Sequence, residues 1–120
     1  MNPPYRLIDA QRRGDVWCVR LRRTRLEEPD VYALADELLA LVNNGCRQMA
    51  LALGPDEPDC IYSVFLAKLM TVQRVLGERG GGLVLCQVSP VARTVFEAAR
   101  LEEQFCFLPD FDAAVAHFAR

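Results

Sequence analysis

The sequence predicts an α/β protein, a single domain of residues 1–120 in which about four helices pack mainly against one face of a mixed, mostly parallel sheet of four to five strands. Short apolar runs alternate with segments of helical periodicity from residue 29 onward, which is typical of parallel strands joined by crossover helices. Gly14-Asp15 separates two earlier strand-like runs, which indicates an antiparallel hairpin. A length of 120 residues is enough for one sizeable core.

The two runs before the first helix, residues 5–10 and 16–22, are predicted to be strands. The second alternates, and its larger apolar side chains, Trp17, Val19 and Leu21, fall on one face. The first strand follows no helix, so we expect it to form the antiparallel edge of the sheet.

Pro29-Asp30 is predicted to open the first helix, which ends at Asn43-Asn44-Gly45, a left-handed stop. The apolar residues between them follow helical spacing and form one stripe: Val31, Leu34, Ala35, Leu38, Leu41 and Val42. Two nearly continuous apolar runs, residues 48–53 and 83–86, are typical of strands covered on both faces. They flank a second helix over residues 64–79.

The last third of the chain is predicted to hold two helices and one strand. Ser89 is a favoured N-cap and Pro90 suits the first helical position. A short strand follows at residues 105–108, and Pro109-Asp110 opens the final helix. The inward-facing residues of the helix after Ser89 are expected to be Val91, Val95, Phe96 and Ala99.

Charge and hydropathy exclude several classes of function. The net charge of −2 gives no bulk attraction to nucleic acid or to an anionic membrane. One short basic cluster is interpreted as a solvated strand end, with a phosphate-binding patch as the alternative: Arg20, Arg22, Arg23 and Arg25. No apolar run approaches the roughly 18 residues of a membrane span. The stretch from Met1 to Tyr5 lacks the pattern of a secretory signal.

The cysteines indicate a reducing compartment. The chain has five, an odd number, with no CxxC pair and with a single histidine, so neither a disulfide framework nor a zinc site is expected. Most lie in apolar strands, where a reduced thiol packs as a small hydrophobe. A cytoplasmic location is therefore predicted.

No residue pattern predicts catalysis. His117 lies three residues from the C-terminus and is expected to be exposed, and Cys60 has nothing basic near it in sequence to lower its pKa. The loop acids Asp56, Glu57 and Asp59 match no metal-binding spacing. We expect no enzyme activity, no metal and no cofactor.

Four stretches of the chain carry a family pattern, in a consistent order and spacing. They are Leu26-Glu27, Ser63 through Leu69, Gly81 through Arg93, and Phe96 through Phe105. Together they resemble the STAS domain, the fold of bacterial anti-sigma factor antagonists, from about Val16 to the C-terminus. The strongest match is the run Gly-Gly-Leu-Val-Leu-Cys followed by Ser-Pro-Val-Ala-Arg.

This resemblance implies a protein-binding regulator in a bacterial partner-switching system. Such an antagonist docks on an anti-sigma factor or serine kinase-type regulator, which phosphorylates a serine or threonine at the start of the second helix and so breaks the complex. The implied acceptor is Ser63. The implied surface is the loop 54–62, the first turns of the following helix and the neighbouring end of the sheet. Its predicted partner-binding residues are Glu27, Asp59, Tyr62, Ser63, Phe65 and Lys68.

The acceptor region departs from the family pattern and leaves alternatives open. Tyr62 and Ala52 stand where the family usually has aspartates, and Glu27 replaces a further aspartate. Ser63 is either a phosphate acceptor or a plain N-cap, and Phe65 is either a contact residue or core. The alternative function is a non-phosphorylated scaffold or a self-assembling module such as a homodimer.

Overall fold

The computed structural model describes residues 5–119, which form a five-stranded sheet in the order β1-β2-β3-β4-β5 with four helices. The elements are β1 Ile8–Arg13, β2 Val16–Leu21, α1 Glu28–Asn43, β3 Gln48–Ala52, α2 Tyr62–Glu78, β4 Gly82–Cys86, α3 Pro90–Ala98, β5 Cys106–Leu108 and α4 Phe111–Phe118. β1 pairs antiparallel with β2, and every other pairing is parallel. The predicted fold class and the antiparallel edge strand are therefore confirmed.

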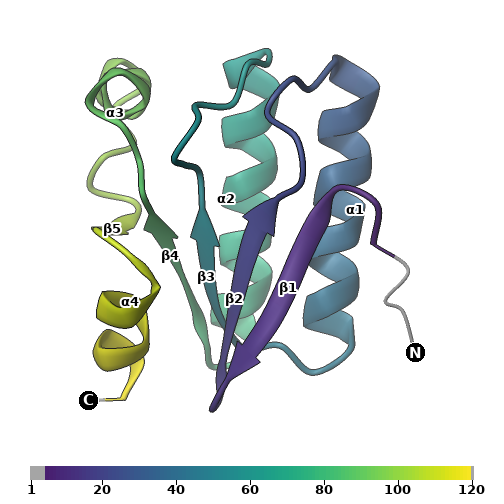
Figure 1. Cartoon of the computed structure of the whole chain (residues 1–120), viewed down its shortest axis with the longest axis vertical. Helices are drawn as coiled ribbons and strands as arrows, with labels where there is room; N and C mark the ends of the chain where they lie inside the picture. Colours follow the sequence, from purple (N-terminus) through teal and green to yellow (C-terminus); the bar gives the residue numbers. More distant parts are fainter. Residues whose placement is uncertain (1–4, 120) are drawn as a thin grey trace.

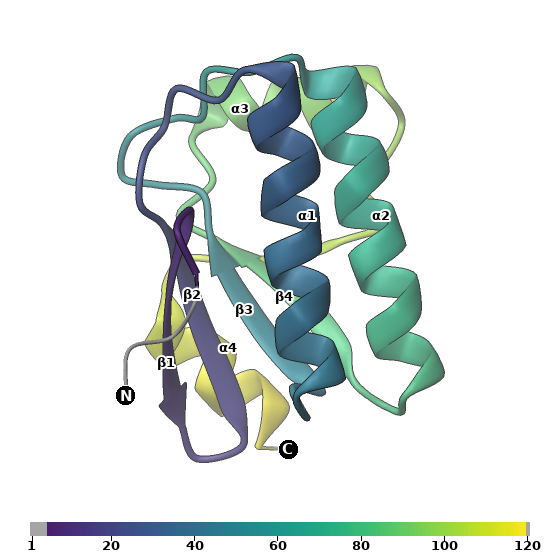
Figure 2. The same cartoon turned by 90° about the vertical axis from the view of Figure 1, so that its right-hand side faces the viewer.

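The longer helices, α1 and α2, lie side by side against one face of the sheet (Figure 2). Trp17, Val19 and Leu21 of β2 face them, as the alternation predicted. The main core fills the space between these helices and the sheet. Its contributions from the two central strands are Met49, Leu51, Leu83 and Leu85.

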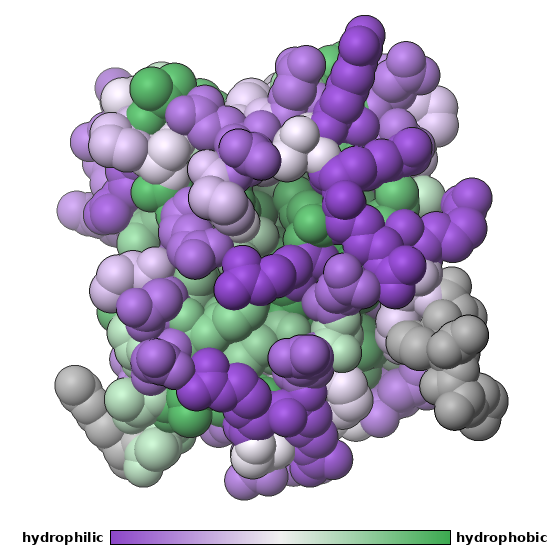
Figure 3. Space-filling view, in the orientation of Figure 1, coloured by the Kyte–Doolittle hydropathy of each residue, from purple (hydrophilic) through white to green (hydrophobic). Residues whose placement is uncertain are grey.

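The opposite face of the sheet is not bare, because α4 packs on it (Figure 1). Ala114 of α4 packs here on small or medium-sized buried strand residues, which let the helix approach the sheet closely: Val16, Cys18, Ala50, Ala52, Val84 and Cys86. The prediction of helices mainly on one face thus holds for α1 and α2, and α4 is the exception. On this side of the molecule, hydrophilic side chains surround a central area of weakly hydrophobic residues, drawn in pale green (Figure 3).

Two predictions about individual elements were wrong. The first strand runs from Ile8 to Arg13 rather than over residues 5–10, because its pairing with β2 continues to the turn. Val91 of α3 and its C-cap Ala99 are exposed, while Ala92 and Phe96 are buried. α3 lies beyond the carboxyl end of β4 (Figure 1), so only a narrow strip of it, Ala92 and Phe96, meets the core.

No helix within residues 5–119 is long and apolar enough to cross a membrane. The prediction about a secretory signal concerns residues 1–5, of which 1–4 lie outside the described part of the chain.

Candidate partner-binding site

The loops that follow β2, β3 and β4 converge at the carboxyl ends of the parallel strands, where open α/β sheets commonly bind their ligands (Figure 1). Backbone hydrogen bonds join two of these loops. The amide of Leu26 donates to the carbonyl of Asp59 at 2.9 Å, and the amide of Asp59 donates to the carbonyl of Thr24 at 2.7 Å. The start of α1 and the start of α2 are therefore held together.

The β3–α2 loop is also held against the loop after β4. A Cβ atom added to Gly54 would lie 2.4 Å from the carbonyl oxygen of Gln87, so only glycine fits this approach. The hydroxyl of Ser89 donates to the Glu57 carboxylate at 2.7 Å. The Glu57 oxygen is thus used in holding the loop to the N-terminus of α3.

Ser63 lies in the first turn of α2, and its side chain is exposed. The helix begins at Tyr62, two residues earlier than predicted, with Ile61 in extended conformation as the N-cap. The interpretation of Ser63 as an N-cap is therefore wrong. No hydrogen bond within residues 5–119 engages its hydroxyl, which faces solvent beside the free amides of the first helical turn.

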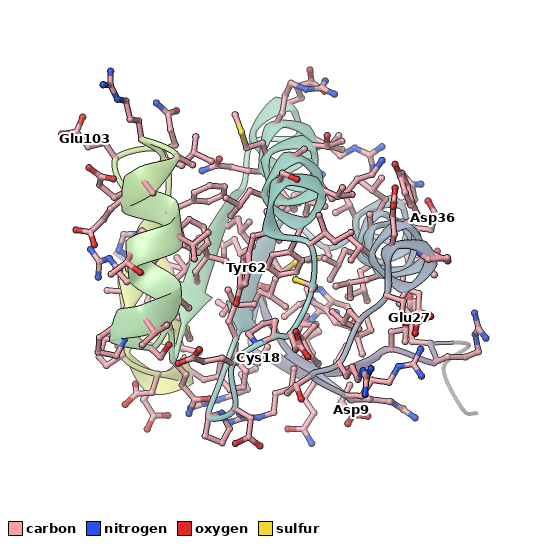
Figure 4. All side chains as sticks on the ribbon, turned by 90° about the horizontal axis from the view of Figure 1, so that it is seen from above. Asp9, Cys18, Glu27, Asp36, Tyr62 and Glu103 are labelled. Carbon is pink, nitrogen blue, oxygen red and sulfur yellow. The ribbon has the colours of Figure 1, made fainter. Side chains whose placement is uncertain are left out.

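Tyr62 lies between α3 and the end of α1 that carries Glu27 (Figure 4). Its hydroxyl donates to the carbonyl of Pro58 at 2.7 Å, and its ring meets the edge of Phe65 with centroids 6.0 Å apart. Burial, with smaller effects of Cys60 and the loop acids, raises the pKa of Tyr62. The ring is thus half-buried and anchors the loop.

Glu27 and Asp59 are both exposed on the two joined loops. The backbone amide of Glu27 donates a hydrogen bond of 2.9 Å to the Asp30 carboxylate, which satisfies one free amide at the start of α1. Both predicted carboxylates therefore stand at the same end of the molecule as Ser63.

Phe65 and Lys68 differ in their exposure. Phe65 is 1% exposed and belongs to the core, so the contact role predicted for it is wrong. Two residues after the exposed Ser63, a side chain points to the opposite side of α2, which is the side that packs on the sheet. Lys68 is half-buried and places its ammonium nitrogen 4.6 Å from the centre of the Tyr32 ring on α1.

Two exposed apolar side chains were missed by the sequence analysis. Ile61, immediately before α2, is 50% exposed, and Val91, in the first turn of α3, is 63% exposed. The sequence predicts a loop at Ile61, and helical spacing predicts Val91 in the core. No local pattern distinguishes an exposed isoleucine at a helix start from a buried one.

The residues considered for catalysis do not form a site. Burial, reinforced by the neighbouring Asp59 carboxylate, raises the pKa of the Cys60 thiol to about 11, so the reactive thiolate is scarce near neutral pH. His117 is exposed on α4, far along the chain from that loop. Within residues 5–119 no group of three or more histidine, cysteine or acidic side chains could hold a metal ion.

Comparisons with known proteins agree with this geometry. No family model matches the chain. It is 36% identical over 85 residues to the proposed anti-sigma factor antagonist BtrV of Bordetella bronchiseptica, a match that covers 71% of this chain and 72% of BtrV.

Solved structures show the same fold. An anti-sigma factor antagonist (STAS) domain protein from Planctomyces limnophilus aligns with a TM-score of 0.75 and 22% identity, over 91% of this chain and 95% of that one. The Bacillus cell fate determinant SpoIIAA in its phosphorylated form aligns with a TM-score of 0.66 and 16% identity, over 94% and 99%. The fold is therefore that of a STAS domain. With the BtrV match, the chain belongs to the family of anti-sigma factor antagonists.

Proposed function

We propose that this protein binds an anti-sigma factor through the surface around Ser63, and that phosphorylation of Ser63 dissociates the complex. The observation that carries the proposal is the exposed hydroxyl of Ser63 in the first turn of α2. A kinase reaches such a hydroxyl without unfolding the helix. SpoIIAA, which shares the fold, has been solved in a phosphorylated form.

The position of Ser63 makes the added charge tolerable within the domain. A phosphate brings about −1.5 to −2 charges and three acceptor oxygens. The free amides and positive dipole end of α2 stabilise such charge beside Ser63. The folded domain therefore survives modification, and the cost falls on whatever is docked there.

The surroundings of Ser63 define the contact surface. Ile61 supplies an exposed apolar side chain two residues away, and Glu27 and Asp59 supply carboxylates on the joined loops. An apolar centre with a polar rim is typical of protein interfaces. Because Glu27 and Asp59 already make this rim negative, a phosphate on Ser63 adds like charge, and it would lose its hydration under a docked partner, which weakens docking.

The test is phosphorylation by the cognate serine kinase, with the modified residue mapped by mass spectrometry. We expect one phosphate, at Ser63, and none in a Ser63→Ala variant. Ser89 is the internal control, because its hydroxyl is already bound to Glu57. Stable binding to the partner without any incorporation would instead support the non-phosphorylated scaffold or self-assembling module.

Binding is tested separately with a charge-mimicking pair of variants. Ser63→Asp should lose the partner in pull-downs from the native cell, and Ser63→Ala should retain it. Thr71→Asp is the control, because it adds the same charge to α2 about two turns further along the helix. Equal loss with Thr71→Asp would show that charge anywhere on the helix suffices, and would contradict the proposed surface.

A further inference from the structure

A cavity of about 370 Å³ lies at the opposite end of the sheet from Ser63, where the β1–β2 turn meets the loops that follow α1 and α2. Its lining residues are Arg12, Asp15, Trp17, Gly45, Arg47, Gln48 and Gly80. This volume is in the range of small-molecule sites. The residues of the proposed partner surface contribute nothing to it.

The cavity has a flat aromatic wall. Trp17 is the single tryptophan of the chain and is half-buried here. It is the cross-strand partner of Arg12, whose guanidinium carbon stands 5.7 Å from the centre of the indole ring. Arg12 also donates from Nε to the carbonyl of Gly14 at 2.9 Å, which orients the guanidinium at the cavity.

The charge of the lining favours an anion. Arg12 and Arg47 outnumber the one acid, Asp15. Asp15 is 92% exposed and 3.7 Å from Arg12, so solvent screens that pair. Within residues 5–119 no hydrogen bond or ion pair engages the Arg47 guanidinium. A guanidinium is well suited to hold phosphate, because its donors form a planar fork.

Two features of the backbone shape this site. The amide of Gly82 donates to the carbonyl of Arg47 at 2.9 Å, and a Cβ on Gly81 would lie 1.7 Å from the same oxygen, so this packing fixes the Arg47 backbone. The C-terminal end of α1 carries partial negative charge, which would repel an anion. This charge is offset because Arg79 donates to the Val42 carbonyl at 3.0 Å.

We propose that this cavity binds a small phosphate-bearing molecule, with the phosphate held by Arg12 and Arg47 and any ring or apolar part against Trp17. The site is independent of the partner surface, so its failure would leave the proposed function untouched.

The fluorescence of Trp17 reports directly on the site, because the chain has no other tryptophan. The protein is titrated at fixed ionic strength with phenyl phosphate, inorganic phosphate and phenol. We expect saturable fluorescence changes with phenyl phosphate and at least about tenfold weaker binding of phenol. If inorganic phosphate binds as tightly as phenyl phosphate, the ligand is free phosphate. If inorganic phosphate binds more weakly, the ligand is a phosphate monoester.

Arg47→Ala should weaken phenyl phosphate binding at least about tenfold. Arg74→Ala is the matched control, because Arg74 is an exposed arginine of α2 that lines a different surface. Calorimetry checks both variants independently of fluorescence. Absence of saturable binding, equal binding of phenol and phenyl phosphate, or an unchanged affinity in Arg47→Ala would each overturn the proposal.

Discussion

Ser63 and Ser89 stand near the starts of two helices, yet their hydroxyls have different partners. Ser89 is the N-cap of α3, and its hydroxyl accepts a hydrogen bond from the amide of Ala92 at 3.0 Å. Ser63 is one residue inside α2, where its hydroxyl points to solvent. Sequence identified both serines correctly as helix-start residues. It assigned Ser89 as an N-cap, which the structure confirms, and left the role of Ser63 open, because the exact first residue of α2 depends on how the preceding loop is held.

We therefore expect Ser89→Ala to destabilise the protein more than Ser63→Ala. The first variant loses a cap and the contact with Glu57, and should cost about 1 kcal/mol in the free energy of unfolding. The second loses an exposed hydroxyl and should change it by less than about 0.5 kcal/mol. Urea unfolding of both variants measures the difference. Equal costs would contradict the assignment of Ser63 as an uncapped, exposed residue.

The raised pKa of Cys60 makes a second prediction at the residue scale. A thiol with a pKa of about 11 forms thiolate only as the pH rises toward that value. At pH 8 its alkylation should be about a hundredfold slower than that of an unperturbed cysteine peptide. The alkylation rate of Cys60 should still rise with pH at pH 10, where the rate of the peptide has reached its plateau.

Alkylation followed by peptide mass spectrometry measures this profile for Cys60 alone. A rate that levels off near pH 8 would show an activated thiol and would revive the enzymatic interpretation of this loop. Slow alkylation with a pH profile like that of the peptide would show that limited access, and not the raised pKa, protects the thiol.

At the scale of elements, glycines decide how α2 ends. Gly77 lies inside the last turn of the helix with open space around its missing side chain, while Gly81 touches the Arg47 carbonyl. Sequence predicted that the glycine run ends the helix, and Gly80 does so with a φ of 81°. It could not predict that Gly81 is needed for a contact with a residue 34 positions earlier, because nothing local signals that approach.

We expect Gly77→Ala and Gly81→Ala to act in opposite directions. Gly77→Ala should stabilise the protein by about 0.4–1 kcal/mol, because alanine reduces the freedom of the unfolded chain and fits the helix. Gly81→Ala should destabilise it, because the new Cβ would collide with backbone at 1.7 Å. Thermal and urea unfolding give the sign of each change. Destabilisation by Gly77→Ala of the same size would contradict this packing.

At the scale of the whole molecule, the sequence predicted the sheet, its edge strand and the helices well, because alternation and helical spacing record which residues enter the core. The apolar stripe of α1 shows the strength of this signal, since Leu34, Leu38 and Leu41 are buried as their spacing predicted. The candidate site was harder to predict. The pairing of Leu26 with Asp59 joins segments 33 residues apart, and the exposure of Ile61 and Val91 depends on such loop packing.

The central claim is that new charge on Ser63 releases a docked partner from an intact domain. Calorimetric titration of the cognate anti-sigma factor with unmodified protein and with protein fully phosphorylated at Ser63 tests it most directly. We predict an affinity loss of at least about tenfold, equivalent to about 1.4 kcal/mol, with unchanged circular dichroism. Equal affinities of the two forms, with phosphate confirmed on Ser63, would contradict the account.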